Sequence, residues 1–194
     1  MAHTETQRRN HNRVPLLRSQ IRALREAAEA SACASKGAND SDTAGRFLTA
    51  TVNAGFALEL GLKMFYMTFY KRGGKGHDLR KLFDKLPEQI RGDIKESYTA
   101  SLATSTLPAT LEAIAFRFSP DVPAKPENLI VRNVGIAEGV IDEAADAFER
   151  GRYFYEKIGS EDWAVIAYPI DHMLFLSHVL DTVYDEYSRR GGWH

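Results

Sequence analysis

The sequence predicts an all-α fold: an antiparallel helical bundle with a core of three long helices and short satellite helices. Two observations lead to this prediction. Apolar residues recur at steps of three and four along most of the chain, whereas strand-type alternation never persists for more than a few residues. The chain of 194 residues is 44% hydrophobic and 26% charged, which is typical of one globular domain with a substantial core.

A half-buried helix is expected from Leu16 to about Ser35, because apolar residues there alternate with arginines and glutamates. Gly37 is expected to end it. Residues 1–13 are polar and contain no apolar run, so the sequence predicts a flexible tail there. A single domain is then expected over 14–194.

The second helix is expected after Asn39–Asp42, whose side-chain oxygens can cap its first turn, and it extends to about Lys71. Apolar residues cover most of its circumference, so this helix is predicted to be central and nearly enclosed. Gly55 and Gly61 lie within it, and each glycine costs about 1 kcal/mol relative to alanine in a helix. Both therefore predict a close contact with a crossing helix.

Glycines make 71–76 a loop, which is followed by two short helices that begin near His77 and Pro87. Prolines interrupt the helical spacing over 97–128, where one short helix is expected at Leu111–Phe118. Helical spacing is better defined in the two segments that follow, residues 136–159 and the segment from Trp163 to the C-terminus.

Regular spacing returns at Ile136 and predicts a long helix that ends near Gly159. Ser160–Asp162 has the composition of a helix cap. An apolar seam from Trp163 to the C-terminus predicts the last long helix, with a kink or a restart at Pro169.

The composition excludes several classes of protein. A formal net charge of -1 gives no global field that would hold the chain on a nucleic acid, so any such contact must be local. Cys33 is the single cysteine, which excludes an internal disulfide and a multi-cysteine metal cluster and fits a reducing compartment. Asp171, His178 and Asp185 recur every seven residues, without the four-residue spacing of metal ligands on one helix. We expect a cytoplasmic protein with no membrane segment, metal or cofactor.

Two segments resemble the HEPN family of helical bundles. Ala57–Lys63, followed by a loop and then His77–Leu82, is similar to that family's apolar helix with Glu and Lys, which leads to a His-Asp-Leu helix start. Phe148–Glu156 is similar to the aromatic Arg-Tyr segment of a later helix. The resemblance covers residues 40–160 and implies an antiparallel bundle of four or five helices that commonly dimerises. It also implies either metal-free RNA cleavage or non-catalytic association with a nucleotidyltransferase or another partner.

Ribonucleases of that family carry an arginine and a histidine, separated by four to six residues, on a late helix. Here only Arg72 and His77 match, and they lie in the early glycine-rich loop. Chemically the pair would suffice, since His can move the proton of a ribose 2′-hydroxyl while Arg holds phosphate oxygens. Their position instead favours a non-catalytic HEPN-like homodimer that binds a partner protein, a nucleotide or RNA. A toxin–antitoxin or defence context is expected, with a nucleotidyltransferase or antitoxin as possible partner. The alternative is a metal-independent endoribonuclease using Arg72 and His77.

Further polar residues complete the expected site. Glu59 and Lys63 are spaced for an ion pair on one helix, and they are expected to form a buried polar network with Arg152 or, alternatively, to line a pocket for a nucleotide phosphate. The basic loop could hold a phosphate on its side chains and glycine amides, although a solvated loop is the plain alternative. Residues proposed to contact a ligand are Lys71, Lys75, Asp78, Arg80, Arg152 and Tyr155.

Overall fold

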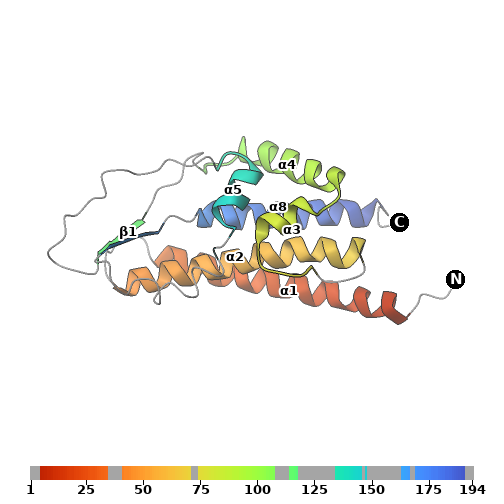
Figure 1. The fold of residues 1–194 in the computed structure, drawn as a ribbon, viewed down its shortest axis with the longest axis horizontal. Coiled ribbons are helices and arrows are strands. Elements are labelled where there is room, and N and C mark those ends of the chain that lie inside the picture. Colours follow the sequence, from red (N-terminus) through yellow and green to blue (C-terminus); the bar gives the residue numbers. More distant parts are fainter. Residues whose placement is uncertain are drawn as a thin grey trace.

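The computed structural model describes residues 5–34, 41–70, 74–107, 114–117, 134–145, 147, 163–166 and 169–190. The elements are α1 (Glu5–Ala34), α2 (Ser41–Phe69), α3 (Leu79–Asp84), α4 (Glu88–Leu102), β1 (Ile114–Arg117), α5 (Ala137–Glu143), β2 (Trp163–Ile166) and α8 (Ile170–Arg189). The predicted all-α bundle is confirmed, with α1, α2, α8 and α4 side by side along its length (Figure 1). A short two-stranded ribbon lies at one end.

Contacts between the helices fix their directions. Arg18 of α1 pairs with Asp185 of α8, and Arg25 reaches the carbonyl of Ser177, so these two helices are antiparallel. The ring of Phe65 in α2 packs edge-on against Tyr184 of α8. Because Gly61 of α2 lies against Leu180, four residues earlier on each helix, α2 and α8 are parallel.

The central position predicted for α2 is confirmed. Its fully or nearly buried hydrophobic residues are Phe47, Ala50, Ala54, Ala57, Leu58, Leu62, Met64, Phe65 and Tyr66. A Cβ atom added at Gly61 would lie 3.0 Å from Cδ1 of Leu180, tighter than most real contacts. Glycine at this position therefore lets α8 approach closely, as the sequence predicts.

The N-terminal boundary differs from the prediction. Helix α1 already begins at Glu5, so residues 5–13 belong to a helix and not to a flexible tail, and Pro15 lies inside it. Glu, Gln and Arg in this segment have high helix propensity without forming an apolar stripe. A helix that depends on propensity alone gives no periodic signal in the sequence.

Two predicted helical stretches are wrong. Residues Ile114–Arg117 and Trp163–Ile166 form the antiparallel strands β1 and β2, with Ile114 opposite Ile166. Short apolar runs rich in β-branched and aromatic residues fit either element, and only the pairing of two distant runs decides between them. Helix α8 starts after Pro169, which confirms the predicted restart there.

The long helix that the sequence predicts from Ile136 to about Gly159 is interrupted after α5. Helix α5 ends at Glu143 and a turn follows at residues 144–145, whereas residue 147 is again helical; residues 146 and 148–159 lie outside the described residues. The carbonyl of Ala145 accepts a hydrogen bond from the backbone N–H of Leu79, the first residue of α3. This tertiary contact joins the turn after α5 to the start of α3.

None of the helices within the described ranges is long and apolar enough to cross a membrane.

Candidate functional site

Helix α2 places a carboxylate in the interior of the bundle. Glu59 follows Leu58 on this nearly enclosed helix, and its side chain is only 1% exposed. Lys63, one turn later, donates from Nζ to Oε1 of Glu59 at 2.5 Å, so the ion pair predicted from the spacing is confirmed. A buried carboxylate is tolerated when partners supply hydrogen bonds and charge.

His77 is the second partner of this carboxylate. Its Nδ1 lies 3.0 Å from both Oε1 and Oε2 of Glu59, although the two residues are 18 positions apart in the sequence. The imidazole is 60% exposed and Lys63 is 18% exposed, whereas Glu59 is buried. These three side chains, which we call the Glu59 cluster, therefore lead from the core to the surface.

The described end of the glycine-rich loop is packed against α2. A Cβ atom added at Gly74 would lie 3.0 Å from Leu82 and 3.3 Å from both Lys63 and Tyr66. Gly76 has a φ of +89°, a left-handed conformation that glycine adopts at little cost. The two glycines thus let the chain turn over α2 and bring the next residue, His77, onto Glu59.

Helix α3 starts with an acid that caps it. An oxygen of Asp78 accepts from the backbone N–H of Lys81 at 2.9 Å, and Nζ of Lys81 lies 2.9 Å from the other oxygen. These bonds lower the pKa of Asp78, with the backbone bond as the main cause. Asp78 is therefore a cap residue that also fixes where the helix begins after the Glu59 cluster.

Arg80 joins two helices. Its Nε donates to Asp84 at 3.1 Å, and its Nη1 donates to both oxygens of Asp142 in α5 at 2.9 and 3.1 Å. The hydrogen bond to Asp84 and the charge of Asp142 raise its pKa. Because two carboxylates already neutralise this guanidinium, Arg80 is a weaker candidate for ligand binding than the sequence indicated.

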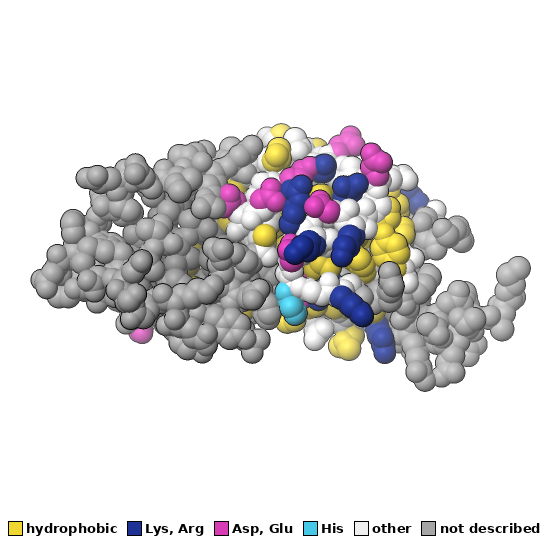
Figure 2. All heavy atoms as spheres, viewed as in Figure 1, with side chains coloured by type: hydrophobic (Ala, Val, Ile, Leu, Met, Phe, Trp, Pro, Cys, Tyr) yellow, Lys and Arg dark blue, Asp and Glu magenta, His cyan; other side chains and the backbone are white. Residues whose placement is uncertain are grey.

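Exposed lysines follow the Glu59 cluster along the loop and helix α3. Lys75, Lys81 and Lys85 are exposed, and we call them the basic face. Figure 2 shows Lys and Arg side chains gathered over the region of α3, with acidic side chains among and above them. Between residues 74 and 87 there are four Lys or Arg against two Asp, a net charge of +2. A local basic patch therefore exists on a chain of nearly zero net charge.

The structure brings part of the predicted site together. Glu59, Lys63, Lys75 and His77 lie around one region of α2 and the loop, with Asp78 and Arg80 at the start of α3. Four predicted residues, Lys71, Arg72, Arg152 and Tyr155, lie outside the described residues. The sequence allowed His77 a hydrogen bond to another helix but did not identify Glu59 as its partner. The available signal was the group of glycines just before His77, which permits a tight return of the chain.

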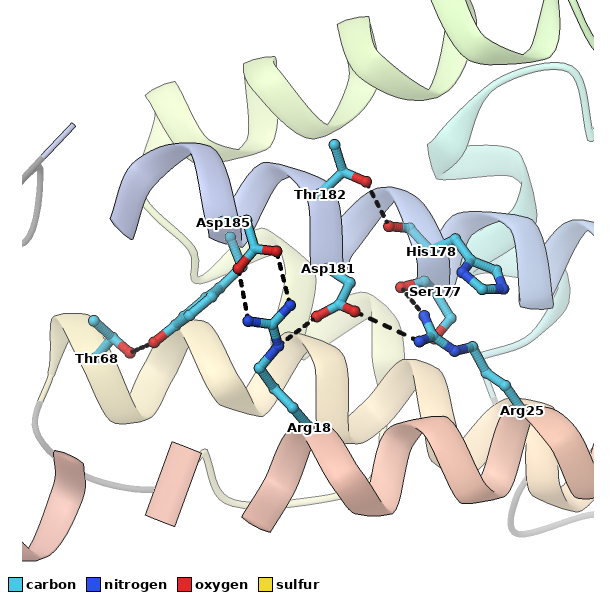
Figure 3. A network of polar contacts seen from close by, with 9 residues as sticks. Arg18, Arg25, Thr68, Ser177, His178, Asp181, Thr182 and Asp185 are labelled. Carbon is cyan, nitrogen blue, oxygen red and sulfur yellow. Dashed lines mark hydrogen bonds and ion pairs between the residues drawn. The ribbon is translucent and has the colours of Figure 1, made fainter. Parts of the chain in front are cut away.

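A second polar network, also missed by the sequence, joins α1 to α8. Arg18 donates to Asp181 at 2.9 Å and to both oxygens of Asp185 at 2.6 and 2.8 Å, while buried Arg25 lies 3.5 Å from Asp181 (Figure 3). These four residues form what we call the α1–α8 seam. The hydrogen bonds that Arg18 donates to Asp185 are the main cause that raises the pKa of Arg18. His178 lies seven residues before Asp185 on α8, and its Nε2 is 3.9 Å from Oε1 of Glu29 on α1.

No group of three or more potential metal ligands occurs within the part of the chain that the structure describes. Comparisons with protein-family models, curated proteins and solved structures find no match for this chain.

Proposed function

We propose that this chain is a non-catalytic, HEPN-like RNA-binding protein that holds the phosphates of its ligand on the basic face. The observation that carries the proposal is the arrangement of the Glu59 cluster beside Lys75 and Lys81. An imidazole bonded to a buried carboxylate lies at the surface, in a segment that also carries the exposed Lys75 and Lys81, and Lys81 pairs with Asp78. Exposed lysines attract the phosphate backbone through their charge. The packed loop holds Lys75 in place, and helix α3 holds Lys81.

The sequence resemblance supports the same class of function, because HEPN-like bundles include proteins that act by binding. Arg80 is held by Asp84 and Asp142, so the described arginine nearest to His77 in the sequence is not poised to clamp a reacting phosphate. We therefore propose binding without cleavage, by a homodimer that associates with a partner such as an antitoxin or a nucleotidyltransferase.

Fluorescence anisotropy with a labelled single-stranded RNA of about 20 nucleotides tests the binding proposal at about 50 and 200 mM salt. We expect Lys75→Glu with Lys81→Glu to weaken binding about tenfold at the lower salt, because two phosphate contacts become repulsive. The matched control is Arg22→Glu with Arg46→Glu, two exposed arginines on α1 and α2 that change the net charge equally. An equal loss in both double variants, or no measurable binding by the wild type, would contradict the proposal.

One observation favours a second candidate, a metal-independent ribonuclease using Arg72 and His77. The imidazole of His77 is bonded to Glu59, and Gly74 is packed against α2, so this histidine is better positioned than a mobile loop would allow. The binding proposal nevertheless predicts no useful cleavage of single-stranded or transfer RNA by the concentrated protein. Robust cleavage that survives EDTA and disappears in both Arg72→Ala and His77→Ala would establish the ribonuclease.

A further inference from the structure

An exposed aromatic residue lies where α2 ends. Tyr70 follows Phe69, the last residue of the helix, and it is 41% exposed. Its backbone N–H donates to the carbonyl of Tyr66 at 2.9 Å, which continues the hydrogen bonding of α2 by one residue. The helix therefore fixes the backbone of an aromatic residue that remains at the surface.

Two further contacts hold the side chain of Tyr70. Its hydroxyl donates to the carbonyl of Lys85 at 2.8 Å, and its ring centroid lies 5.4 Å from that of Tyr66, with 48° between the planes. Tyr66 is 7% exposed, and its own hydroxyl donates to the carbonyl of Leu82 in α3 at 2.7 Å. The ring of Tyr70 thus lies against a buried side chain that is itself bonded to α3. A ring held in this way loses little conformational freedom when a ligand contacts it.

The residue that accepts this hydrogen bond belongs to the basic face. Lys85 is the C-cap of α3 and is exposed. The acid that precedes it, Asp84, pairs with Arg80. A held aromatic ring and an exposed ammonium group are therefore carried by two residues that are hydrogen-bonded to each other. Proteins bind unpaired nucleic-acid strands with this combination, because aromatic rings stack on the bases and cationic side chains hold the phosphates.

We propose that the ring of Tyr70 stacks on an unpaired nucleobase while Lys85 holds a nearby phosphate, so that the basic face selects single-stranded RNA. In this proposal the base takes the side of the ring that faces away from Tyr66. Stacking requires a base whose face is free, and in a duplex the neighbouring bases cover both faces. The inference rests on the proposed RNA binding, and it names the form of RNA that the site takes.

Two strands of equal charge test the stacking. The first is a labelled single-stranded RNA, and the second has the same ribose-phosphate backbone without bases. In fluorescence anisotropy we expect the wild type to bind the RNA about tenfold more tightly than the abasic strand, as for one stacked base. Annealing the RNA to its complement should also weaken binding, although the duplex carries more phosphate charge.

Substitutions at Tyr70 separate its ring from its hydroxyl. Tyr70→Phe and Tyr70→Leu both lose the hydrogen bond to Lys85, but only leucine removes the aromatic ring. We expect Tyr70→Phe to keep the preference near tenfold, and Tyr70→Leu to bind the RNA as weakly as the abasic strand. Lys85→Glu should instead weaken both strands and keep their ratio, because it changes charge alone. The control is Leu16→Ala, at an exposed apolar residue of α1, which should keep the wild-type ratio.

A fluorescent base provides a readout that does not depend on affinity. A 2-aminopurine base in an otherwise abasic strand loses fluorescence when an aromatic ring stacks on it. At saturating protein, the wild type and Tyr70→Phe should quench this base, whereas Tyr70→Leu should not. Circular dichroism of each variant checks that its helices are retained.

The outcomes separate the two proposals. Equal binding of the RNA and the abasic strand by the wild type, with the charge reversals at Lys75 and Lys81 still weakening both, overturns the stacking and leaves the proposed function standing. A preference or a quench that persists in Tyr70→Leu, or that Tyr70→Phe also abolishes, overturns the role of the ring. Absence of binding to either strand overturns both proposals. A preference near tenfold that Tyr70→Leu abolishes and Tyr70→Phe keeps supports the inference.

Discussion

The Glu59 cluster and the α1–α8 seam both place charged side chains between elements of the bundle, but they differ in which side chain is the most buried. In the Glu59 cluster the carboxylate is 1% exposed, and its partners are 18% and 60% exposed. In the seam the most buried group is the guanidinium of Arg25, at 7%, and Asp185 is 44% exposed. The Glu59 cluster extends from the buried carboxylate to an exposed imidazole, whereas the charged groups of the α1–α8 seam pair with one another.

The bonding of the two groups differs in the same way. Both oxygens of Glu59 accept hydrogen bonds from its two partners. Among the described residues, Nε of Arg25 and Oγ of Ser177 are buried without a hydrogen-bond partner, so the seam is incompletely satisfied. The comparison indicates that the seam joins two helices, while the Glu59 cluster orients a side chain that is mostly exposed. Four substitutions test this difference, in order of expected size.

Glu59→Ala should have the largest effect, a loss of about 3 kcal/mol in the free energy of unfolding, because Lys63 loses its partner beside the core. Urea unfolding followed by circular dichroism measures it. Glu96→Ala, an exposed glutamate on α4, is the matched control and should change stability by less than about 0.5 kcal/mol. Equal midpoints for wild type and Glu59→Ala would mean that the carboxylate is not buried as described.

Gly76→Ala should destabilise the fold by about 1–2 kcal/mol, because alanine must adopt the left-handed backbone that Gly76 has. No atom lies within 4 Å of the added Cβ, so the cost comes from the backbone alone. The control is Gly92→Ala in α4, which also meets no atom within 4 Å and should stabilise the protein by about 0.5–1 kcal/mol. Thermal unfolding distinguishes the two opposite signs, and stabilisation by Gly76→Ala would refute the strained turn before His77.

Arg18→Met should cost about 1 kcal/mol, less than Glu59→Ala, because the seam is partly exposed and Arg25 remains near Asp181. The effect should shrink at high salt, since exposed ion pairs are screened. Arg46→Met, an exposed arginine at the start of α2, is the control. Chemical unfolding at low and high salt gives the measurement. A loss as large as that of Glu59→Ala would reverse the ranking of the two groups.

His178 should produce the smallest effect, a dependence of stability on pH. Burial is the main cause that lowers its pKa, and the charge of Arg25 lowers it further, against raising contributions from Glu29 and Asp181. A histidine with a lowered folded-state pKa contributes stability above its unfolded pKa of about 6.5 and loses that contribution as pH falls through the folded value. His178→Asn should therefore show a smaller loss of melting temperature between about pH 8 and pH 5 than the wild type. If the wild type and His178→Asn lost the same melting temperature between about pH 8 and pH 5, this contribution of His178 would be excluded.

The features that the sequence predicted correctly depend on local spacing. Apolar residues around the whole of α2 predicted its burial, and four-residue spacing predicted the pair of Glu59 and Lys63. The glycine-rich loop predicted a helix start near His77, where α3 begins at Leu79, and Pro169 predicted the boundary at which α8 begins. Each of these features follows from the spacing of residues along one helix, where backbone geometry alone fixes the distances between neighbouring turns.

By itself, then, the sequence determined the all-α fold class, which helix is central, and which charges pair along one helix. Tertiary structure alone decided that His77 meets Glu59, 18 residues away, and that Arg18 meets Asp185, 167 residues away. It also decided that Ile114–Arg117 and Trp163–Ile166 become strands, since neither run can form a ladder without the other. The physical reason is that helix crossings and chain returns set these distances, and residue spacing carries no information about which distant side chains will meet.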